Sequence, residues 1–309
     1  MRLTDIQHTD YSVLYRALPA MALLLIIEAV EAIKERRHDN RDFFASLALL
    51  AGTIPVSFIT TGIIAFTYSF IYQFRFFTIP SSCWWSWPIL FFGDDLSYYW
   101  FHRNSHKIRF FWASHMVHHS SENFTLTSGL RVPWTGNLTG NFLHWVWMPL
   151  IGIEPAMVML MKSTSAIYQF WLHTEKIYKL PKWFEAVFNT PSHHRVHHAS
   201  NVEYLDKNHA GTLIVWDKMF GTFQSETTRP KFGLTENIKS YNPLVIAFHE
   251  WKNIVMDMRR SKKLKDRINY LFKPPGWSHD GSQKTAKQLQ YENNSKKREN
   301  DSIPQHSSI

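Results

Sequence analysis

The stretch SHHRVHH, residues 192–198, places four histidines within seven positions: His193, His194, His197 and His198. Imidazole has an ordinary pKa of about 6.5, and neighbouring imidazoles repel one another once they are protonated. Such a cluster is therefore stable only when it is neutral, or when its nitrogens face a positive charge such as a metal ion. The fold is expected to bring further ligands to the same place.

Two other histidine clusters supply those candidates. HRNSH contains His102 and His106, and HMVHH contains His115, His118 and His119. Residues three and four apart share one face of a helix, so each cluster is expected to aim two or three imidazoles in one direction. A catalytic zinc ion uses three protein ligands, so this many imidazoles indicates two metal ions. Ligand type alone leaves zinc, copper, iron and nickel open.

Composition excludes several other classes of site. Cys83 is the single cysteine, which excludes disulfide frameworks, iron–sulfur clusters and cysteine-based zinc sites within one chain. No HExxH motif supplies the glutamate base of a zinc peptidase. The net charge is +9 and basic residues concentrate at 259–267. Without a recognition motif for nucleic acid, this segment favours an anionic membrane surface.

Long apolar runs predict membrane-spanning helices, each of which needs ~20 apolar residues to cross the bilayer. The candidate segments are 18–33, 43–79 and 84–100, followed by a helical hairpin at 142–172. The basic loop at 34–41 is expected in the cytoplasm, and counting crossings from it places every histidine cluster there too. We therefore predict an all-α integral membrane protein with a cytosolic, histidine-rich di-metal cap. The alternative is a helical protein with an ordinary buried core.

The predicted organisation has three parts. Residues 1–101 form N-terminal transmembrane helices, with Gly52, Pro55 and Gly62 as kink points in the second span. Residues 102–280 form the catalytic region, which includes the hairpin. Residues 281–309 form a polar tail that is expected to be disordered, because it has too few apolar residues to build a core.

Three isolated histidines need separate interpretations. His173 ends an apolar span on the predicted cytoplasmic side, which makes it a candidate ligand by position. His144 lies within an apolar segment and is interpreted as a membrane-interface residue, and His249 as a structural one.

Longer motifs around the clusters resemble the fatty acid hydroxylase, or sterol desaturase, superfamily of membrane di-iron oxygenases. The resemblance covers residues 94–277 and rests on DLSYYWFHRNSH, WASHMVHHSSE, YQFWLHTE, NTPSHHRVHH and DKNHAGTLIVWDKMFGTF. Within the superfamily, YQFWLHTE, NTPSHHRVHH and the WDKMFGTF block, together with FGLTENI and FKPPGW, are most similar to the alkylglycerol monooxygenase family. That family cleaves ether lipids by hydroxylating the carbon beside the ether oxygen, with tetrahydropterin as the reductant.

The resemblance implies a role for each site residue. Iron-ligand roles fall on His102, His106, His115, His118, His119, His194, His197 and His198, with His173 as a further ligand. His193 is implied as a ligand or as a residue that orients one. Asp95 and Asn208 match polar positions of the family and are expected to orient imidazoles, since a ligating histidine usually donates its other N–H to an oxygen.

The implied activity is oxidation of a lipid C–H bond at the bilayer, with two iron ions, O2 and external electrons. The chain has no Rossmann glycine fingerprint and no CxxCH motif, so the electrons are expected from tetrahydropterin or from a cytochrome or ferredoxin system. The sequence departs from the ether-cleaving pattern at Lys107, Thr125, Ser128 and Gly129, and His209 replaces an expected tyrosine. Desaturation, hydroxylation of a sterol or fatty acyl chain, a zinc-dependent lipid hydrolase and a non-catalytic metal or lipid carrier therefore stay open.

Overall fold

The structure is a computed structural model that describes residues 3–35 and 39–302. Its α-helices are α1 (Leu3–Lys34), α2 (Asn40–Tyr72), α3 (Ser86–Lys107), α4 (Arg109–His119), α5 (Leu126–Gly129), α6 (Trp147–Ile151), α7 (Pro155–Phe170), α8 (Lys182–Val187), α9 (Pro191–His197), α10 (Val215–Met219), α11 (Pro243–Arg260), α12 (Leu264–Phe272) and α13 (Ala286–Ser302). The 3-10 helices are η1 (Asn137–Thr139), η2 (Asn141–Trp145) and η3 (Val202–Tyr204). Within these described ranges, β-type pairing is limited to isolated bridges, so the predicted all-α class is confirmed.

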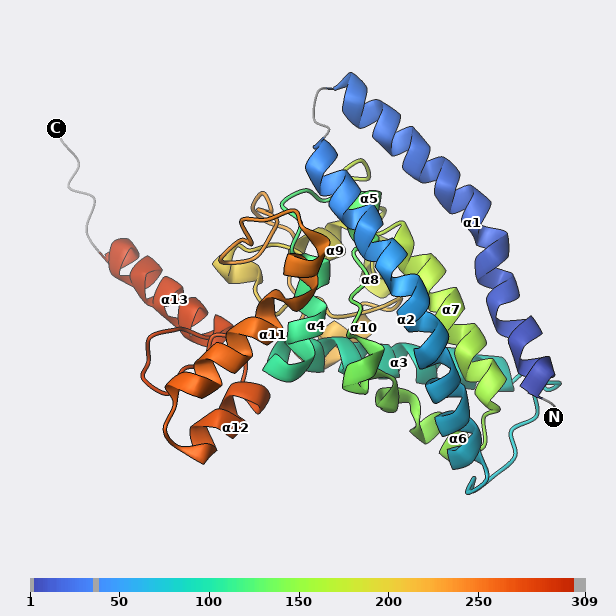
Figure 1. The fold of residues 1–309 in the computed structure, drawn as a ribbon. Helices are drawn as coiled ribbons and strands as arrows, with labels where there is room; N and C mark the ends of the chain where they lie inside the picture. Colours follow the sequence, from blue (N-terminus) through green and yellow to red (C-terminus); the bar gives the residue numbers. More distant parts are fainter. Residues whose placement is uncertain (1–2, 36–38, 303–309) are drawn as a thin grey trace.

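Long helices cover one side of the molecule. In Figure 1, α1, α2 and α7 run beside one another, and α1 packs chiefly against α7. Of the described helices, α2 alone is long and apolar enough to cross a membrane, with a mean hydropathy of 1.9 over its most apolar window. Its side chains Phe58 and Phe66 are 86% and 71% exposed, which a lipid environment tolerates far better than water does. The crossings at 18–33, 84–100 and 142–172 stay predictions.

The predicted kink positions do not interrupt α2, which runs as one helix through Gly52, Pro55 and Gly62. Gly52 instead serves packing, because a Cβ atom there would lie 2.3 Å from the Cζ2 atom of Trp134. The indole N–H of Trp134 donates to the Leu49 carbonyl at 2.7 Å. The missing side chain therefore lets the segment after α5 approach the helix closely.

α3 links the apolar side of the molecule to the histidine clusters. It crosses the predicted domain boundary at residue 101 without a break, and its last turns carry His102 and His106. The segment predicted as a hairpin consists of η2, α6 and α7, with a turn at Gly152, where φ is +114°. A Cβ atom at Gly152 would lie 2.2 Å from the Phe77 carbonyl oxygen, so this turn requires glycine. Leu90 of α3 packs into the same core as this segment.

The C-terminal region is more ordered than predicted. Residues 286–302 form α13, and its Gln290 amide donates to the Leu205 carbonyl at 2.8 Å. The polar composition correctly indicates that this segment has no core of its own. Disorder was nevertheless the wrong prediction for 286–302, because Ala, Lys, Gln, Leu and Glu are good helix formers and the helix docks on η3. Residues 303–309 lie outside the described residues.

Candidate metal centre

Nine histidine side chains from four segments meet in the interior. They come from the end of α3, from α4, from the turn after α7, and from α9 with the residue that follows it. Their ligand atoms form two groups, and within each group all of them lie within 4.8 Å of one another. Group 1 consists of His102, His106, His115, His119 and His197, and group 2 of His118, His173, His194 and His198.

The two HxxHH motifs are divided between the groups. In α4, His115 and His119 face group 1 while His118 faces group 2. In α9 the arrangement is reversed. His194 faces group 2, as does His198 directly after the helix, while His197 faces group 1. Successive helical residues differ by ~100°, so adjacent histidines point in clearly different directions. The prediction that a whole HxxHH motif aims one way was therefore wrong, and each motif contributes to both groups.

In group 1, main-chain carbonyls determine which ring nitrogen carries the proton. His102 donates from Nδ1 to the His209 carbonyl at 2.9 Å, and His197 donates from Nδ1 to the Lys207 carbonyl at 2.9 Å. A neutral imidazole that is protonated on Nδ1 has a lone pair on Nε2. The Nε2 atom of His102 lies 2.9 Å from Nε2 of His115, and Nε2 of His197 has no hydrogen-bond partner among the described residues. These lone pairs converge on one point.

Group 2 has the same chemistry. His173 donates from Nδ1 to the Gln169 carbonyl at 3.2 Å. Its Nε2 lies 3.0 Å from Nε2 of His194 and 3.1 Å from Nε2 of His118. The Nε2 atom of His198 lies 3.2 Å from that of His194. Four ring nitrogens thus crowd together, and a shared cation would stabilise them.

Burial keeps these imidazoles neutral. Loss of solvent lowers the pKa of every one of them below the ordinary value, and neighbouring imidazoles lower it further in all of them except His173. The pKa of His115 falls to about 3, and those of His173 and His197 to about 4. Neutral imidazole is the form that binds a metal ion. Five such ligands in group 1 and four in group 2 fit one transition-metal ion each.

His193, which the resemblance implies as a ligand or an orienting residue, belongs to neither group. Its ring packs against Phe223 with the ring centroids 5.5 Å apart, and its Nδ1 atom has no hydrogen-bond partner in the described part of the chain. The side chain is only 3% exposed. Although it adjoins His194 in sequence, the rotation of α9 directs it away from both groups.

Asp95 and Asn208 do not contact an imidazole, contrary to the expectation. Asp95 accepts hydrogen bonds from the Thr212 amide at 2.7 Å and from the indole of Trp216 at 2.9 Å. Asn208 donates to the carbonyls of Gln224 at 2.7 Å and of His193 at 3.0 Å. Both side chains therefore hold the loop at 208–216. That loop supplies the carbonyl to which His102 donates, so their effect on the ligands is indirect.

His209 is a site residue that pattern analysis could not identify as such. Its fully buried ring lies 5.0 Å from the ring of His106 and 5.7 Å from that of His102, between centroids. Its Nδ1 atom has no hydrogen-bond partner within residues 3–35 and 39–302, whereas Nε2 lies 3.1 Å from the Asp206 carbonyl. His209 has no neighbouring histidine at helical spacing. Only its replacement of an expected tyrosine marked it in the sequence.

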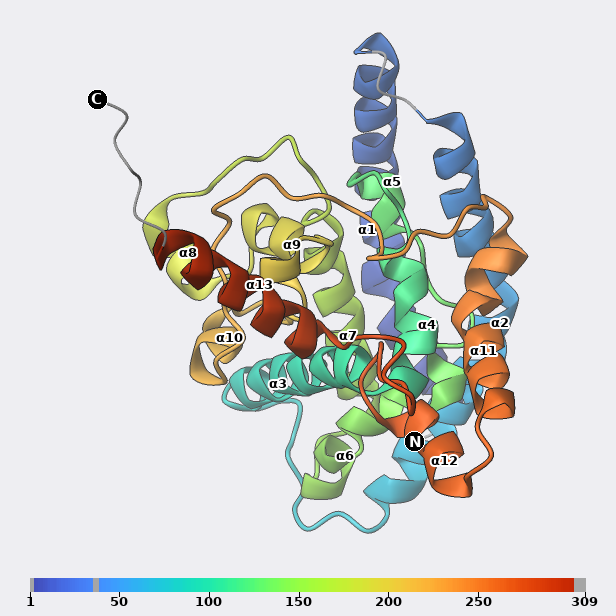
Figure 2. The same cartoon turned by 90° about the vertical axis from the view of Figure 1, so that its left-hand side faces the viewer.

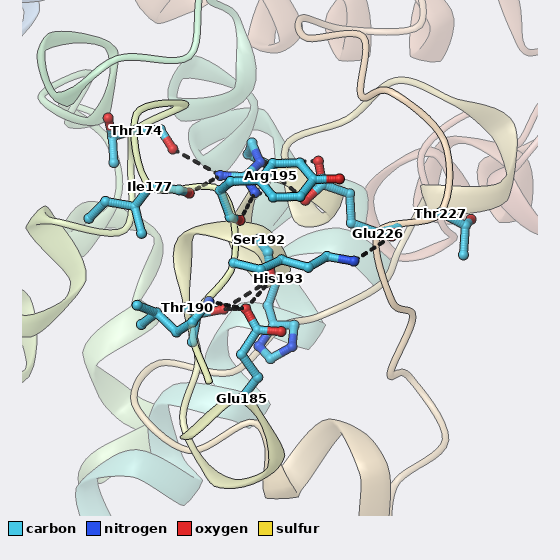
Figure 3. A network of polar contacts seen from close by, with 12 residues as sticks. Thr174, Ile177, Glu185, Thr190, Ser192, His193, Arg195, Glu226 and Thr227 are labelled. Carbon is cyan, nitrogen blue, oxygen red and sulfur yellow. Dashed lines mark hydrogen bonds and ion pairs between the residues drawn. The ribbon is translucent and has the colours of Figure 1, made fainter. Parts of the chain in front are cut away.

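A buried ion pair holds α9 in place, as Figure 3 shows. Arg195 lies between the two histidine pairs of α9 and contacts Glu226 with Nη2 to Oε2 at 2.7 Å. Its Nη1 atom donates to the carbonyls of Ile177 at 2.7 Å and Thr174 at 3.2 Å. Arg195 therefore joins α9, which together with the next residue carries three candidate ligands, to the segment that begins with His173.

Glu185 holds the other end of α9. Its Oε1 atom accepts from the hydroxyl of Ser192 at 2.8 Å and from that of Thr190 at 3.2 Å (Figure 3). Pro191 is the first residue of the helix, where its fixed φ is favourable and a missing N–H is harmless. The orientation of α9 is thus set at both ends by side chains that do not touch the histidine groups.

Two cavities have residues of α3 in their walls. A cavity of about 790 Å³ lies beside the C-terminal helices, and its wall includes His106, His119, His197 and His198. A second cavity of about 370 Å³ lies between α2, α3 and α7, with Phe101 in its wall. Of these two, the larger gives a small molecule direct access to candidate ligands.

Comparison with known proteins agrees with this site. Residues 87–222 match the family model of the fatty acid hydroxylases, and they include every member of groups 1 and 2. This part of the chain belongs to the fatty acid hydroxylase family, as the sequence motifs predicted.

The chain is also similar to alkylglycerol monooxygenases. It is 35% identical to the one from Homo sapiens over 268 residues, which are 85% of this chain and 59% of that protein. It is 38% identical to the one from Danio rerio over 67% of this chain and 46% of that protein. A weaker similarity, 23% identity over 42% of this chain and 39% of the relative, links it to the ornithine lipid hydroxylase OlsE from Rhizobium tropici.

The chain spans about half the length of the alkylglycerol monooxygenases that it matches. No solved structure matches the chain.

Proposed function

We propose that the chain is a membrane-bound di-iron oxygenase that hydroxylates or desaturates a lipid C–H bond, using O2 and external electrons. One observation carries this proposal: two groups of buried, neutral imidazoles converge within a fatty acid hydroxylase domain. The relatives named above are a monooxygenase and a hydroxylase that act on lipids, which supports the same class of reaction. The name of the first group of relatives makes alkylglycerols the leading candidate substrates, and cleavage of ether lipids the leading candidate reaction.

The residues of the chain have three tasks in this proposal. The histidines of group 1 would hold one iron ion and those of group 2 a second, and the carbonyls of Gln169, Lys207 and His209 keep the Nε2 atoms free to bind. Burial of the ligands excludes bulk water from the reacting space. When bound, the iron pair supplies the redox chemistry that activates O2 for attack on an unreactive C–H bond.

A zinc-dependent lipid hydrolase is the alternative, because imidazole also suits zinc. Zinc has no redox chemistry and would need neither O2 nor electrons. Group 1 has five imidazoles and group 2 has four, so each group exceeds the three protein ligands of a catalytic zinc site, which favours iron.

Two departures from the ether-cleaving pattern lie beside group 1. Lys107 pairs with Asp206 at 2.6 Å, and the other oxygen of that carboxylate lies 3.6 Å from Nδ1 of His106. His209 lies beside the same imidazole. We infer that these positions adjust the surroundings of group 1, and that hydroxylation or desaturation of a sterol or fatty acyl chain is the second candidate reaction.

Electrons are proposed to arrive from outside the chain, carried by tetrahydropterin or by a cytochrome or ferredoxin partner. The 790 Å³ cavity is wide enough for a small molecule to reach the histidines. We propose an integral membrane location with this site facing the cytoplasm, supported by the long apolar α2 and the basic loop at 34–41.

The test combines metal analysis with lipid mass spectrometry. Protein purified in mild detergent should contain close to two metal ions per chain, and iron should be required for turnover. Lipid extracts supplied with a reductant should gain one oxygen or lose two hydrogens in air, and stay unchanged under nitrogen. Full activity with zinc alone, or turnover without O2, would exclude the oxygenase and support the hydrolase.

A further inference from the structure

α12 has an apolar face that the rest of the chain leaves exposed. Leu264, Ile268 and Phe272 are spaced by four residues and are 71%, 48% and 60% exposed, so they form one row along the helix. Tyr270 lies about 200° around the helix from Ile268. It is 3% exposed and packs on Trp277, with the ring centroids 5.1 Å apart. α12 is thus firmly docked by one face while the opposite face presents apolar side chains outward.

Basic side chains border this row. Residues 259–273 contain seven Lys or Arg residues and one acidic residue, a net charge of +6. Lys265 and Arg267 lie on either side of the row and are exposed. Lys262, Lys263 and Lys265 form no ion pair with the described part of the chain. An apolar stripe bordered by unpaired cations suits the headgroup region of an anionic bilayer, where apolar groups enter the acyl chains and cations meet phosphates.

Apolar side chains of α2 are exposed toward the same end of the molecule as α12. In Figures 1 and 2, α12 and the C-terminal end of α2 both lie toward the bottom of the molecule. At that end of α2, Phe66 and Phe70 are 71% and 48% exposed, and Phe76 and Phe77 in the following loop are also exposed.

We propose that α12 lies in the headgroup layer of an anionic bilayer, with Leu264, Ile268 and Phe272 directed into the lipid and Lys262, Lys263, Lys265 and Arg267 bound to lipid phosphates. This docking does not depend on metal chemistry. Charge complementarity and the outward row together select a lipid surface over a protein partner.

The docking has a consequence that rests on the proposed function. The 790 Å³ cavity that reaches the histidines is lined by residues on both sides of α12 along the chain. These are Met256 and Arg260 before the helix and Pro275 and Gly276 after it. A membrane-docked α12 holds this cavity beside the bilayer surface. A lipid can then move from the bilayer toward groups 1 and 2 without crossing bulk water.

The single cysteine allows a direct test on the full chain. In a Cys83→Ser background, an environment-sensitive fluorophore is attached at Ile268→Cys, and the matched control carries it at Tyr291→Cys on α13, where the native side chain is 74% exposed. Both proteins are reconstituted into vesicles that contain phosphatidylserine and acyl-chain-brominated lipids. We expect a blue shift and bromine quenching at position 268, and neither effect at position 291.

The charge requirement is tested in the same assay. A triple variant removes three of the cations, with Lys262→Gln, Lys263→Gln and Lys265→Gln. In phosphatidylserine vesicles it should show no more quenching at position 268 than the protein with all three lysines shows in pure phosphatidylcholine vesicles. Equal quenching with and without the three lysines would refute the anionic-lipid role. The docking would be refuted if the label at position 268 showed the same fluorescence in vesicles as the label at position 291. It would also be refuted if the fluorescence at position 268 changed with duplex DNA in detergent but not with vesicles. None of these readouts uses enzyme activity, so the result is separate from the fate of the oxygenase proposal.

Discussion

Replacing His173 by alanine tests whether group 2 is a metal site of its own. His173 is the one candidate ligand outside the three histidine clusters, and its Nε2 atom lies within 3.1 Å of Nε2 atoms from both His118 and His194. The substitution leaves three imidazoles in group 2 and all five in group 1. We expect the metal content of protein purified in mild detergent to fall from close to two ions per chain to close to one.

The magnitude follows from the position of His173 in the site. Loss of a group that only orients a ligand weakens metal binding ~10- to 100-fold, so loss of a ligand should weaken group 2 by more than ~100-fold. Such a site does not keep its ion through dialysis against a chelator. Group 1 should keep its own ion, because none of its members donates to or accepts from His173.

Two controls separate ligation from packing. Phe124→Ala removes a buried ring whose centroid lies 5.7 Å from that of His173, so it should lower the free energy of unfolding by roughly 3–5 kcal/mol without removing a metal ion. His144→Ala removes an imidazole that lies outside both groups, with Nδ1 bonded to the Asn141 carbonyl at 2.9 Å and Nε2 3.1 Å from the Asn104 amide. Both variants should retain two ions. If His173→Ala also retains two, group 2 is complete with three imidazoles and the reasoning is wrong.

Three further predictions concern the surroundings of the centre. Arg195→Met should lower the free energy of unfolding by ~3–5 kcal/mol in a denaturant titration, because it leaves the Glu226 carboxylate buried without its partner. Adding Glu226→Gln should restore part of this loss. An unchanged free energy of unfolding in both variants would contradict a structural role for the pair. Asp95→Asn should weaken metal binding at group 1 by ~10- to 100-fold in a chelator competition, because it loosens the loop at 208–216 whose carbonyl orients His102. Metal binding at group 2 should be unaffected. Equal weakening at both groups would refute the role of this loop. The pKa values of about 3 for His115 and about 4 for His173 lie below the ~6.5 of an unfolded chain, so the unfolded state binds more protons in acid. The stability of the metal-free protein should therefore be constant above pH ~6.5 and fall as the pH drops toward ~3. A rise in melting temperature as the pH falls over that interval would contradict the burial of these imidazoles.

Local spacing in the sequence determined most of the ligand set. Side chains three and four residues apart on a helix lie on neighbouring parts of its surface wherever the helix is placed, so HRNSH and the two HxxHH motifs identified eight of the nine histidines in groups 1 and 2. His173 was predicted as a ligand only from its position at the end of an apolar span and from the family resemblance. The long apolar run likewise predicted α2, because hydrophobicity over ~20 residues is a property of the segment alone.

The tertiary structure decided which histidine faces which group. That choice depends on the rotation of α4 and α9 about their axes, which contacts distant in sequence determine, such as Arg195 with Glu226. The same rotation turns His193 away, although it adjoins a member of group 2. The orienting acceptors at Gln169, Lys207 and His209 are main-chain carbonyls, which every residue possesses, so no residue pattern can mark them. His209 and the loop held by Asp95 reach group 1 because the chain returns to α3 about a hundred residues later, and only the folded structure shows that return.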